Sequence, residues 1–431
     1  MQQKFKAGIY TLGCRVNQYE SEAITELLRS HGAEIADFSD RCDVYIINTC
    51  AVTEESVRKS RQIIRRAIKS NPDAFVAVCG CASQLEGEEL LKIEGVSLVC
   101  GSRNKSDIAY HALNYIESGV LPENRLDVKA PAGMLEKLQI DSFSRIRAYV
   151  KIEDGCNFNC SYCIIPTVRG RVALRDREDI INEVKALAES GCREVVLTGI
   201  ETSAYGKGLA KLLSDINEID GIERIRLGSL YPSFLDDDFT NEISSLKKVA
   251  PHFHISIQSG SDRILRLMRR GYTAEDIVRN TDYMRKKIPN INFSSDIIVG
   301  FPNETEADYL ETEMLIKRLN MLHTHIFTYS KRPGTPAASM EGQIPENVKS
   351  ERSARLHSVQ SEIKNILLSA VISEKRPLDV LFEQANGNIY TGHTPEFFEV
   401  SAESEFDLRG QILPVLPEKI SGDILSGKLI K

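Results

Sequence analysis

The N-terminal part of the chain alternates between short apolar runs and patterns typical of amphipathic helices. The apolar runs lie at 8–13 (GIYTLG), 44–49 (VYIINT) and 75–80 (FVAVCG), with helical patterns near 18–30 and 53–70. Continuous apolar runs of this length are typical of parallel strands that helices bury on both faces. Residues 1–118 are therefore predicted to form a doubly wound α/β domain.

A second alternating pattern begins after residues 119–145, where Pro122, Pro131 and two glycines, Gly119 and Gly133, indicate a linker. Six strand-like runs follow, each separated from the next by a helical pattern. They end near Gly155, Glu201, Leu230, Ser259, Gly300 and Ser330. This alternation predicts a (β/α)6 partial barrel over residues 146–370, with its active site at the C-terminal ends of the strands.

The last part of the chain, residues 373–431, consists of short runs in which apolar and polar residues alternate and glycines interrupt. A period of two with frequent turns predicts a small antiparallel β-barrel. The predicted fold class is therefore α/β, with an N-terminal doubly wound domain, a central (β/α)6 partial barrel and a C-terminal antiparallel β-barrel.

The composition is that of a globular protein, with 42% hydrophobic and 27% charged residues. The first apolar run follows Lys4 and Lys6 and is too short for a signal peptide or a membrane helix, so we expect a cytoplasmic protein without a membrane partner. All ten cysteines lie in the first 192 residues. Because the cytoplasm is reducing, metal or cluster ligation is a better explanation than disulfides, and no disulfide-linked partner is expected.

The chain has a net charge of −7, but one segment is strongly positive: residues 57–69 (VRKSRQIIRRAIK) contain six basic residues and no acidic one. In a helix, Arg58, Arg61, Arg65 and Lys69 form one continuous stripe. Charge alone favours a solvated helix face, and nucleic-acid binding is the alternative.

Cys156, Cys160 and Cys163 have the spacing C-x3-C-x2-C in the loop after the first predicted barrel strand. Structural zinc prefers four ligands, and no further Cys or His lies nearby downstream. Three thiolates would instead leave one iron of a 4Fe-4S cluster without a protein ligand. Such an iron can bind the amino and carboxylate groups of S-adenosylmethionine (SAM) for reductive cleavage to a radical.

Three more cysteines, Cys14, Cys50 and Cys81, each follow a predicted strand of the N-terminal domain. Ligands of open α/β sheets bind beyond the carboxyl ends of the strands, so these thiols could converge on one sheet edge. Cys79 competes with Cys81, but its place inside the strand favours a buried thiol. Three cysteines without partner spacing are expected in the core: Cys42, Cys100 and Cys192.

The segment CNFNCSYC resembles the signature of the radical SAM superfamily, and its continuation IIPTVRGR resembles the methylthiotransferases in particular. Similar segments cover nearly the whole chain: TLGCRVNQYE, NTCAVTEES, GCASQ, QSGSDRIL, DIIVGFPNETE, YSKRPGTPA and TGHTPEFFEV. The resemblance implies SAM and two 4Fe-4S clusters as cofactors. It assigns one cluster to Cys156, Cys160 and Cys163, and a second, auxiliary cluster to Cys14, Cys50 and Cys81.

The same resemblance implies addition of a methylthio group at C2 of a modified adenosine at tRNA position 37, with an external electron donor and a sulfur source as partners. NTC followed by AVTEES resembles the branch that acts on N6-threonylcarbamoyladenosine. Branches that act on isopentenyladenosine in tRNA or on a ribosomal-protein aspartate share both clusters and stay open. An alternative of another class is a non-catalytic iron–sulfur or zinc protein that binds RNA.

Residues near the predicted strand ends are candidates for SAM contacts, because glycine lets the backbone approach a ligand closely. Ordinary turn chemistry explains each of them equally well. The candidates are Tyr162, Gly199, Glu201, Ser259, Gly300 and Arg332. The third strand ends in Tyr231, where the family often has a polar residue.

The C-terminal part resembles the TRAM module, which binds tRNA in this family. Residues 374–431 contain six basic and ten acidic residues, which makes this module a poor electrostatic clamp for phosphate. With the resemblance in view, RNA binding becomes the favoured reading of the basic helix. The RNA-binding candidates are Arg58, Arg61, Arg65, Lys69, Arg266 and Arg270.

Overall fold

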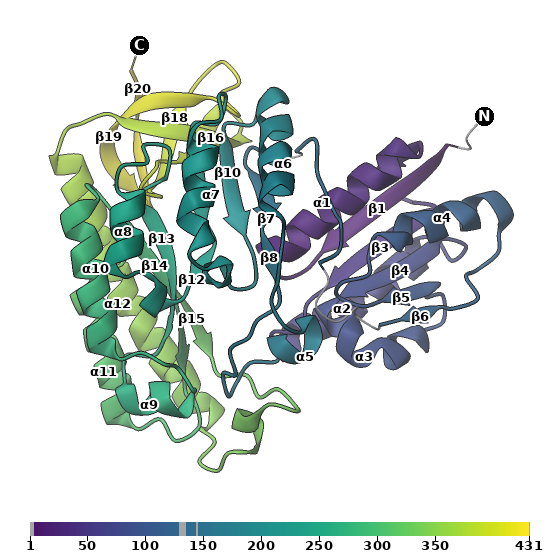
Figure 1. Cartoon of the computed structure of the whole chain (residues 1–431), viewed down its shortest axis with the longest axis horizontal. Helices are drawn as coiled ribbons and strands as arrows, with labels where there is room; N and C mark the ends of the chain where they lie inside the picture. Colours follow the sequence, from purple (N-terminus) through teal and green to yellow (C-terminus); the bar gives the residue numbers. More distant parts are fainter. Residues whose placement is uncertain (1–3, 129–134, 144, 431) are drawn as a thin grey trace.

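A computed structural model describes residues 4–128, 135–143 and 145–430 of the chain. Figure 1 shows an N-terminal sheet with its helices, a central arc of strands and helices, and a small β-barrel at the C-terminus. Part of the predicted linker, including Pro131, lies outside the described residues. No helix within the described ranges combines the length and hydropathy that a membrane span requires.

The N-terminal part is a parallel sheet with the order β2-β1-β3-β4-β5-β6. Its strands are β1 Phe5–Thr11, β2 Ala33–Ile35, β3 Val44–Thr49, β4 Phe75–Gly80, β5 Leu98–Cys100 and β6 Leu126–Asp127. Its helices are α1 Arg15–Ser30, α2 Glu54–Ser70, α3 Cys81–Leu91 and α4 Asp107–Ser118. Strand β6 comes from the predicted linker, so this sheet extends past residue 118.

Side chains along the N-terminal strands point alternately to the two faces of the sheet, and each face has its own apolar core. Val44 and Ile46 pack with α1 and α4, whereas Tyr45 and Ile47 pack with α2 and α3. Both faces of the sheet are therefore covered by helices, which confirms the doubly wound prediction. The same alternation places Cys79 in the core beneath α1 and α4.

The central part is an arc of parallel strands in two sheets, β7-β10-β11 and β12-β13-β14-β15. The strands are β7 Ala148–Lys151, β10 Glu194–Thr198, β11 Arg224–Leu227, β12 Ser229–Leu230, β13 His252–Gln258, β14 Asn292–Val299 and β15 His323–Thr328, with a side pair β8 Glu153–Asp154 and β9 Ala173–Leu174. Because β11 and β12 follow each other directly, they form one position of a six-stranded partial barrel.

Helices connect and cover the barrel strands (Figure 1). They are α5 Ile165–Arg169, α6 Arg177–Glu189, α7 Gly208–Asn217, α8 Asp237–Ile243, α9 Asp262–Leu267, α10 Ala274–Lys287, α11 Glu306–Leu319 and α12 Glu346–Ser373. Short 3-10 helices are η1 Thr202–Tyr205, η2 Pro232–Phe234 and η3 Pro336–Ser339. A large apolar core lies between the arc and these helices.

The C-terminal part is a closed barrel with the order β16-β17-β18-β20-β19. Its strands are β16 Leu378–Asn386, β17 Ile389–His393, β18 Glu399–Glu403, β19 Ile412–Ser421 and β20 Ile424–Leu429. The strand pairs are antiparallel except β18 with β20, so the prediction of an antiparallel barrel holds for most of it.

The small barrel contacts the N-terminal ends of the central strands. Arg224 donates to the carbonyl of His393 at 3.0 Å, and Arg226 donates to that of Thr394 at 2.7 Å. The small barrel therefore lies at the end of the central arc opposite to the C-terminal strand ends, where α5 is found (Figure 1).

Candidate active site

Cys14, Cys50 and Cys81, which we call the N-terminal trio, lie at one edge of the N-terminal sheet. Cys14 follows β1 and is the N-cap of α1, Cys50 follows β3, and Cys81 begins α3 directly after β4. Gly13 has φ +101°, and a Cβ there would lie 3.0 Å from Cβ of Cys50, so the loops after β1 and β3 touch. The convergence predicted from strand ends is therefore present.

Asn17 joins the loops that carry the N-terminal trio. Its Nδ2 donates to the carbonyl of Leu12 at 2.7 Å and to that of Thr49 at 2.9 Å. These carbonyls belong to the residues just before Gly13-Cys14 and Cys50, so one buried amide fixes the distance between the two loops.

The electrostatics of the N-terminal trio fit a thiolate-ligated metal cluster. Burial, together with the neighbouring thiols of Cys81 and Cys14, raises the pKa of Cys50 to about 11. Thiolates packed this closely need compensating positive charge, which metal ions provide. The three free thiols can hold three irons of a cubane cluster and leave one open.

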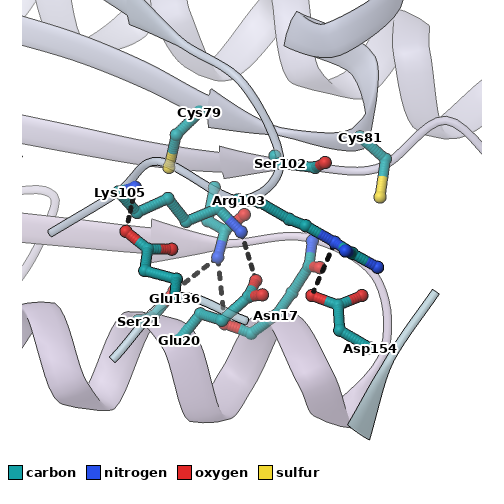
Figure 2. Close-up of polar contacts among 12 residues, drawn as sticks. Asn17, Glu20, Ser21, Cys79, Cys81, Ser102, Arg103, Lys105, Glu136 and Asp154 are labelled. Atoms are coloured by element: carbon teal, nitrogen blue, oxygen red, sulfur yellow. Dashed lines mark hydrogen bonds and ion pairs between the residues drawn. The ribbon is translucent and has the colours of Figure 1, made fainter. Parts of the chain in front are cut away.

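Cys79 lies apart from the trio. Its side chain is fully buried among apolar residues of the core, and burial raises the pKa of its thiol to about 12. Figure 2 shows the Cys79 sulfur on the Lys105 side of a group of charged residues and the Cys81 sulfur on the Asp154 side. This placement supports the choice of Cys81 as the third ligand.

Cys156, Cys160 and Cys163, the barrel trio, lie in the loop between β8 and α5. The loop turns on itself, because Cys163 N donates to the carbonyl of Cys160 and Cys156 N donates to that of Gly170, both at 3.1 Å. Burial raises the pKa of Cys156 to about 12 and that of Cys163 to about 11, and the neighbouring thiols contribute to both shifts. This set of three free thiols also fits a cluster with one open iron.

Aromatic residues at the third strand end support the cysteine loop. Phe158 stacks on Tyr231 with ring centroids 4.1 Å apart, and the Tyr231 hydroxyl accepts from Gly271 N at 2.9 Å. Tyr231 therefore packs under the loop of the barrel trio, at the strand end where the sequence departs from the family's polar pattern.

Arg270 is a correction to the RNA-binding candidates. It is only 8% exposed and lies over the rings of Tyr231 and Tyr272. Its Nη1 donates to Sγ of Cys160 at 3.3 Å, and its Nη2 donates to the carbonyl of Ser256 at 2.7 Å. Because the Arg270 guanidinium is buried and already donates to Cys160 and Ser256, it cannot contact phosphate. Arg270 therefore supports the barrel trio and is not an RNA-binding residue. Arg266, on α9, is exposed as expected.

A cavity of about 250 Å³ opens between the two trios. Val52 and Thr53, which follow Cys50, form one wall, and Tyr162 and Cys163 form another. The floor comes from barrel strands and the β15 loop: Gln258, Asp296, Ile298, Phe327 and Arg332. Cys163 of the barrel trio and the segment that follows Cys50 of the N-terminal trio thus border one space.

Arg332 is a buried cation of this cavity, whose lining also includes the carboxylate of Asp296. Its side chain is 7% exposed, and its Nε has no hydrogen-bond partner. No carboxylate of the described ranges forms an ion pair with it. Burying a charge is unfavourable without a partner, so the cavity favours an anionic group of a ligand beside Arg332.

The other SAM candidates divide into two groups. Glu201 is buried, and its N donates to Oε1 of Glu153 at 2.6 Å; a Cβ at Gly199 would collide with the same carboxylate. These residues line the inside of the strand ends. Ser259 and Gly300 instead support helix packing, because Ser259 contacts Thr312 of α11 and a Cβ at Gly300 would collide with Lys349 of α12. For these two, turn chemistry is the better explanation.

The basic helix predicted from the sequence is α2. Arg58, Arg65 and Lys69 are exposed, and Arg61 is half-buried. Arg58 pairs with Glu55 at 2.6 Å, and Arg61 pairs with Glu86 at 2.8 Å, so two of the four charges are partly neutralised. Arg58 and Arg61 line a groove of about 1080 Å³ that shares Thr53, Phe327 and Arg332 with the cavity, and Lys331 lies on the same rim.

Several site residues were not predicted from the sequence. Gln258 and Asp296 line the cavity, and Arg169 contacts Cys81. A signal existed for Arg169, since it lies in the quoted segment IIPTVRGR directly after Cys163. Charge alone gave no reason to separate it from surface arginines.

Two family comparisons match separate parts of the chain. Residues 150–316 match the radical SAM superfamily, and residues 6–101 match the uncharacterized protein family UPF0004. The first match contains the barrel trio and the second contains the N-terminal trio.

Curated relatives match over nearly the full chain. The threonylcarbamoyladenosine tRNA methylthiotransferase MtaB of Bacillus subtilis is 39% identical over 418 residues, which cover 94% of this chain and 92% of the relative. The tRNA-2-methylthio-N(6)-dimethylallyladenosine synthase of Clostridium beijerinckii is 36% identical over 438 residues, covering 98% and 95%.

Among solved structures, the radical SAM methyltransferase TsrM of Kitasatospora setae, with tryptophan and a SAM analogue bound, aligns with a TM-score of 0.58. The alignment covers 89% of this chain and 79% of TsrM at 16% identity. At this identity the likeness concerns the fold alone.

Proposed function

Because the chain belongs to the radical SAM methylthiotransferase family, we propose that it adds a methylthio group at C2 of N6-threonylcarbamoyladenosine at tRNA position 37. Membership of this family makes the chain an enzyme, so the alternative of a non-catalytic RNA-binding protein is wrong. The relatives modify tRNA, and the ribosomal-protein alternative is set aside for that reason. Because both tRNA branches match at similar identity, the choice of substrate depends on the cavity.

Arg332 is the observation that carries the substrate proposal. A threonylcarbamoyl group has a carboxylate and a hydroxyl, whereas an isopentenyl group is apolar. A buried cation without a carboxylate partner stabilises the first ligand and disfavours the second. Thr53, on the opposite wall, adds a hydroxyl to the same cavity.

The two cysteine trios are proposed to hold the cofactors. The 4Fe-4S cluster of the barrel trio would supply the electron that cleaves SAM, and the auxiliary cluster would carry the sulfur. The chain's own residues bind and orient: Arg332 positions an anionic group, and Tyr162 and Phe327 add aromatic surface to the cavity. The proposed partners are tRNA, an electron donor and a sulfur source, and the proposed location is the cytoplasm.

The substrate proposal is tested with tRNA that lacks only the threonylcarbamoyl group. We expect methylthiolation of this tRNA to fall at least about 100-fold below that of modified tRNA, because polar groups of the cavity lose their partners. Nucleoside mass spectrometry after reaction measures the ratio. Equal rates on the two tRNAs, or preference for isopentenylated tRNA, would contradict the proposal.

Arg332→Met is expected to lower kcat/KM for the modified tRNA roughly 100-fold, because losing one partner of a buried charged contact costs about 2–5 kcal/mol. Cleavage of SAM by dithionite without tRNA should persist. Arg279→Met, on the exposed surface of α10 and outside both the cavity and the groove, is the matched control and should stay near wild type. If Arg332→Met abolishes SAM cleavage without tRNA as well, Arg332 holds the SAM carboxylate and does not support the substrate choice.

The groove beside α2 is the proposed path for tRNA. It shares residues with the cavity, and Arg58, Arg61 and Lys331 are among the residues that line it. The small C-terminal barrel lies at the opposite end of the central arc and is net acidic, so we assign most phosphate contacts to α2.

Arg58→Glu combined with Arg65→Glu is expected to weaken tRNA binding and to flatten its salt dependence, because each lost phosphate contact removes roughly one unit of slope. Filter binding at several salt concentrations measures the slope. Lys317→Glu with Arg318→Glu makes the same charge change on exposed α11 and should leave the slope unchanged. An unaltered slope in the α2 variant would show that the basic residues of this helix face solvent and do not contact phosphate.

A further inference from the structure

A group of buried charged residues, which we call the bridging charge cluster, lies where the N-terminal sheet meets the central barrel (Figure 2). Its members are Glu20 of α1, Arg103 and Lys105 after β5, Lys151 of β7, Asp154 of β8 and Arg169 of α5. Each of these side chains is at most 4% exposed. The cluster therefore holds charge in a region that water does not screen.

Arg169 is the member that reaches the cysteines. Its Nε donates to Sγ of Cys81 at 3.2 Å. Its Nη1 donates to Oε1 of Glu20 at 2.8 Å, and its Nη2 donates to Oδ1 of Asn17 at 2.5 Å. Asn17 is the residue that joins the loops of Cys14 and Cys50, so Arg169 touches the framework of the whole N-terminal trio.

Arg169 also belongs to the loop of the other trio. It lies six residues after Cys163 along the chain, and its Nη1 lies 3.1 Å from Oδ2 of Asp154, two residues before Cys156. Apolar contacts follow the same route, because Ile164 and Val168 pack with Cys81 and Ala82 in one core. A single buried segment thus connects the barrel trio to the N-terminal trio.

The bridging charge cluster has more cations than anions. Arg103, Lys105, Lys151 and Arg169 are positive, and Glu20 and Asp154 are negative. Glu136, the nearest further carboxyl, accepts from backbone N atoms, and burial raises its pKa toward the neutral form. The surplus positive charge lies next to Cys81. Buried charge of one sign calls for an anion, and thiolates bound to an iron–sulfur cluster form one.

We propose that Arg169 is a positioning residue that orients Cys81 and raises the reduction potential of the auxiliary cluster, and this inference rests on the proposed assignment of that cluster to Cys14, Cys50 and Cys81. A guanidinium that donates to a ligand sulfur stabilises the added electron of the reduced cluster. The bridging charge cluster keeps this cation in place without access of water.

The test measures the auxiliary cluster alone, in the full chain with Cys156→Ala, Cys160→Ala and Cys163→Ala. Anaerobic reconstitution should give about four irons per chain. Reductive titration followed by electron paramagnetic resonance then gives the reduction potential with Arg169, with Arg169→Met and with Arg169→Lys. We expect the lowest potential for Arg169→Met. The reduction potential of Arg169→Lys should lie between those of Arg169→Met and of the parent with Arg169, because lysine keeps the charge but not the planar donor geometry.

Arg270→Met is the matched control, because Arg270 is also a buried arginine that donates to a cysteine sulfur, that of Cys160 in the barrel trio. In this background it should leave the potential unchanged. Equal potentials for arginine, methionine and lysine at position 169 would overturn the inference, as would the same shift in Arg270→Met. Loss of folding in both Arg169 variants, seen as loss of the apo melting transition, would also overturn it by making the role purely structural.

Two further outcomes distinguish the positioning role of Arg169 from the assignment of the auxiliary cluster. If Arg169→Met melts like its parent without iron but holds fewer irons after reconstitution, the positioning role is supported. If the parent with the three barrel substitutions binds no iron, the assignment of the auxiliary cluster fails, and the inference fails with it.

Discussion

Cys156→Ala is expected to abolish reductive cleavage of SAM, whereas Cys14→Ala should still produce 5′-deoxyadenosine and lose only the methylthiolated nucleoside. The two cysteines belong to separate trios on separate elements, β8–α5 and β1–α1. Only the barrel trio lies at the C-terminal strand ends of the barrel, where SAM is expected to bind. No other proposed site offers a low-potential electron to the sulfonium.

The measurement is chromatography of 5′-deoxyadenosine and of the product nucleoside, side by side, after anaerobic reconstitution. Cys81→Ala should match Cys14→Ala. Cys79→Ala is the matched control, since it removes a thiol two residues away that lies in the core, and it should keep both products. Loss of SAM cleavage in Cys14→Ala with an intact barrel cluster would contradict this division of labour. Loss of product in Cys79→Ala alone would move the third ligand from Cys81 to Cys79.

Glu20→Ala is expected to lower the free energy of unfolding of the apo protein by about 3–5 kcal/mol, the usual cost of removing one partner from a buried ion pair. Glu20 is fully buried and accepts from Lys151 at 2.8 Å and from Arg169 at 2.8 Å. Lys105 also pairs with it. Without this carboxylate, Asp154 alone faces the cations of the bridging charge cluster.

Urea unfolding followed by circular dichroism measures this loss. Glu89→Ala is the control, because Glu89 forms an exposed ion pair with Lys92 at 2.6 Å and its removal should change stability by at most about 1 kcal/mol. Since Glu20 connects α1 to β7 and α5, we also expect the N-terminal sheet to separate from the barrel at lower urea in Glu20→Ala. Equal stability of the two variants would show that other contacts at this boundary dominate.

Periodicity along the chain was sufficient for the architecture. The predicted strand ends at Leu230 and Ser259 lie within one residue of the ends of β12 and β13. Buried strands need continuous apolar runs, and the helices that cover them need a period near 3.6, so this information is local. The C-terminal pattern predicted a small barrel for the same reason, although it did not predict the parallel pairing of β18 with β20.

The candidate cysteines could also be found from sequence, because a loop residue after a parallel strand has a defined place. Cys14, Cys50 and Cys81 meet since their strands are neighbours or next neighbours in the order β1-β3-β4. Strand β4 ends at Gly80, whose φ is +102°, and Cys81 begins α3, so this turn separates Cys81 from Cys79, which stays in the core. Here the connection between sequence and site is the geometry of the sheet itself.

The roles of the charged residues could not be predicted without the tertiary structure. From the sequence, Arg169 was not singled out, whereas Arg270 was a candidate for RNA binding and Arg332 a candidate for SAM contact. In the folded protein the first contacts Cys81, the second contacts Cys160, and the third lies unpaired in the cavity.

Side-chain periodicity within single elements was enough to identify which segments become strands and helices and which thiols reach a sheet edge. Which charges are buried, and what they face, depends instead on how distant segments pack. The partners Glu20, Lys105, Lys151 and Arg169 come from four elements or loops of the chain. Whether a charge is solvated or buried depends on contacts between distant segments, and no local pattern records them.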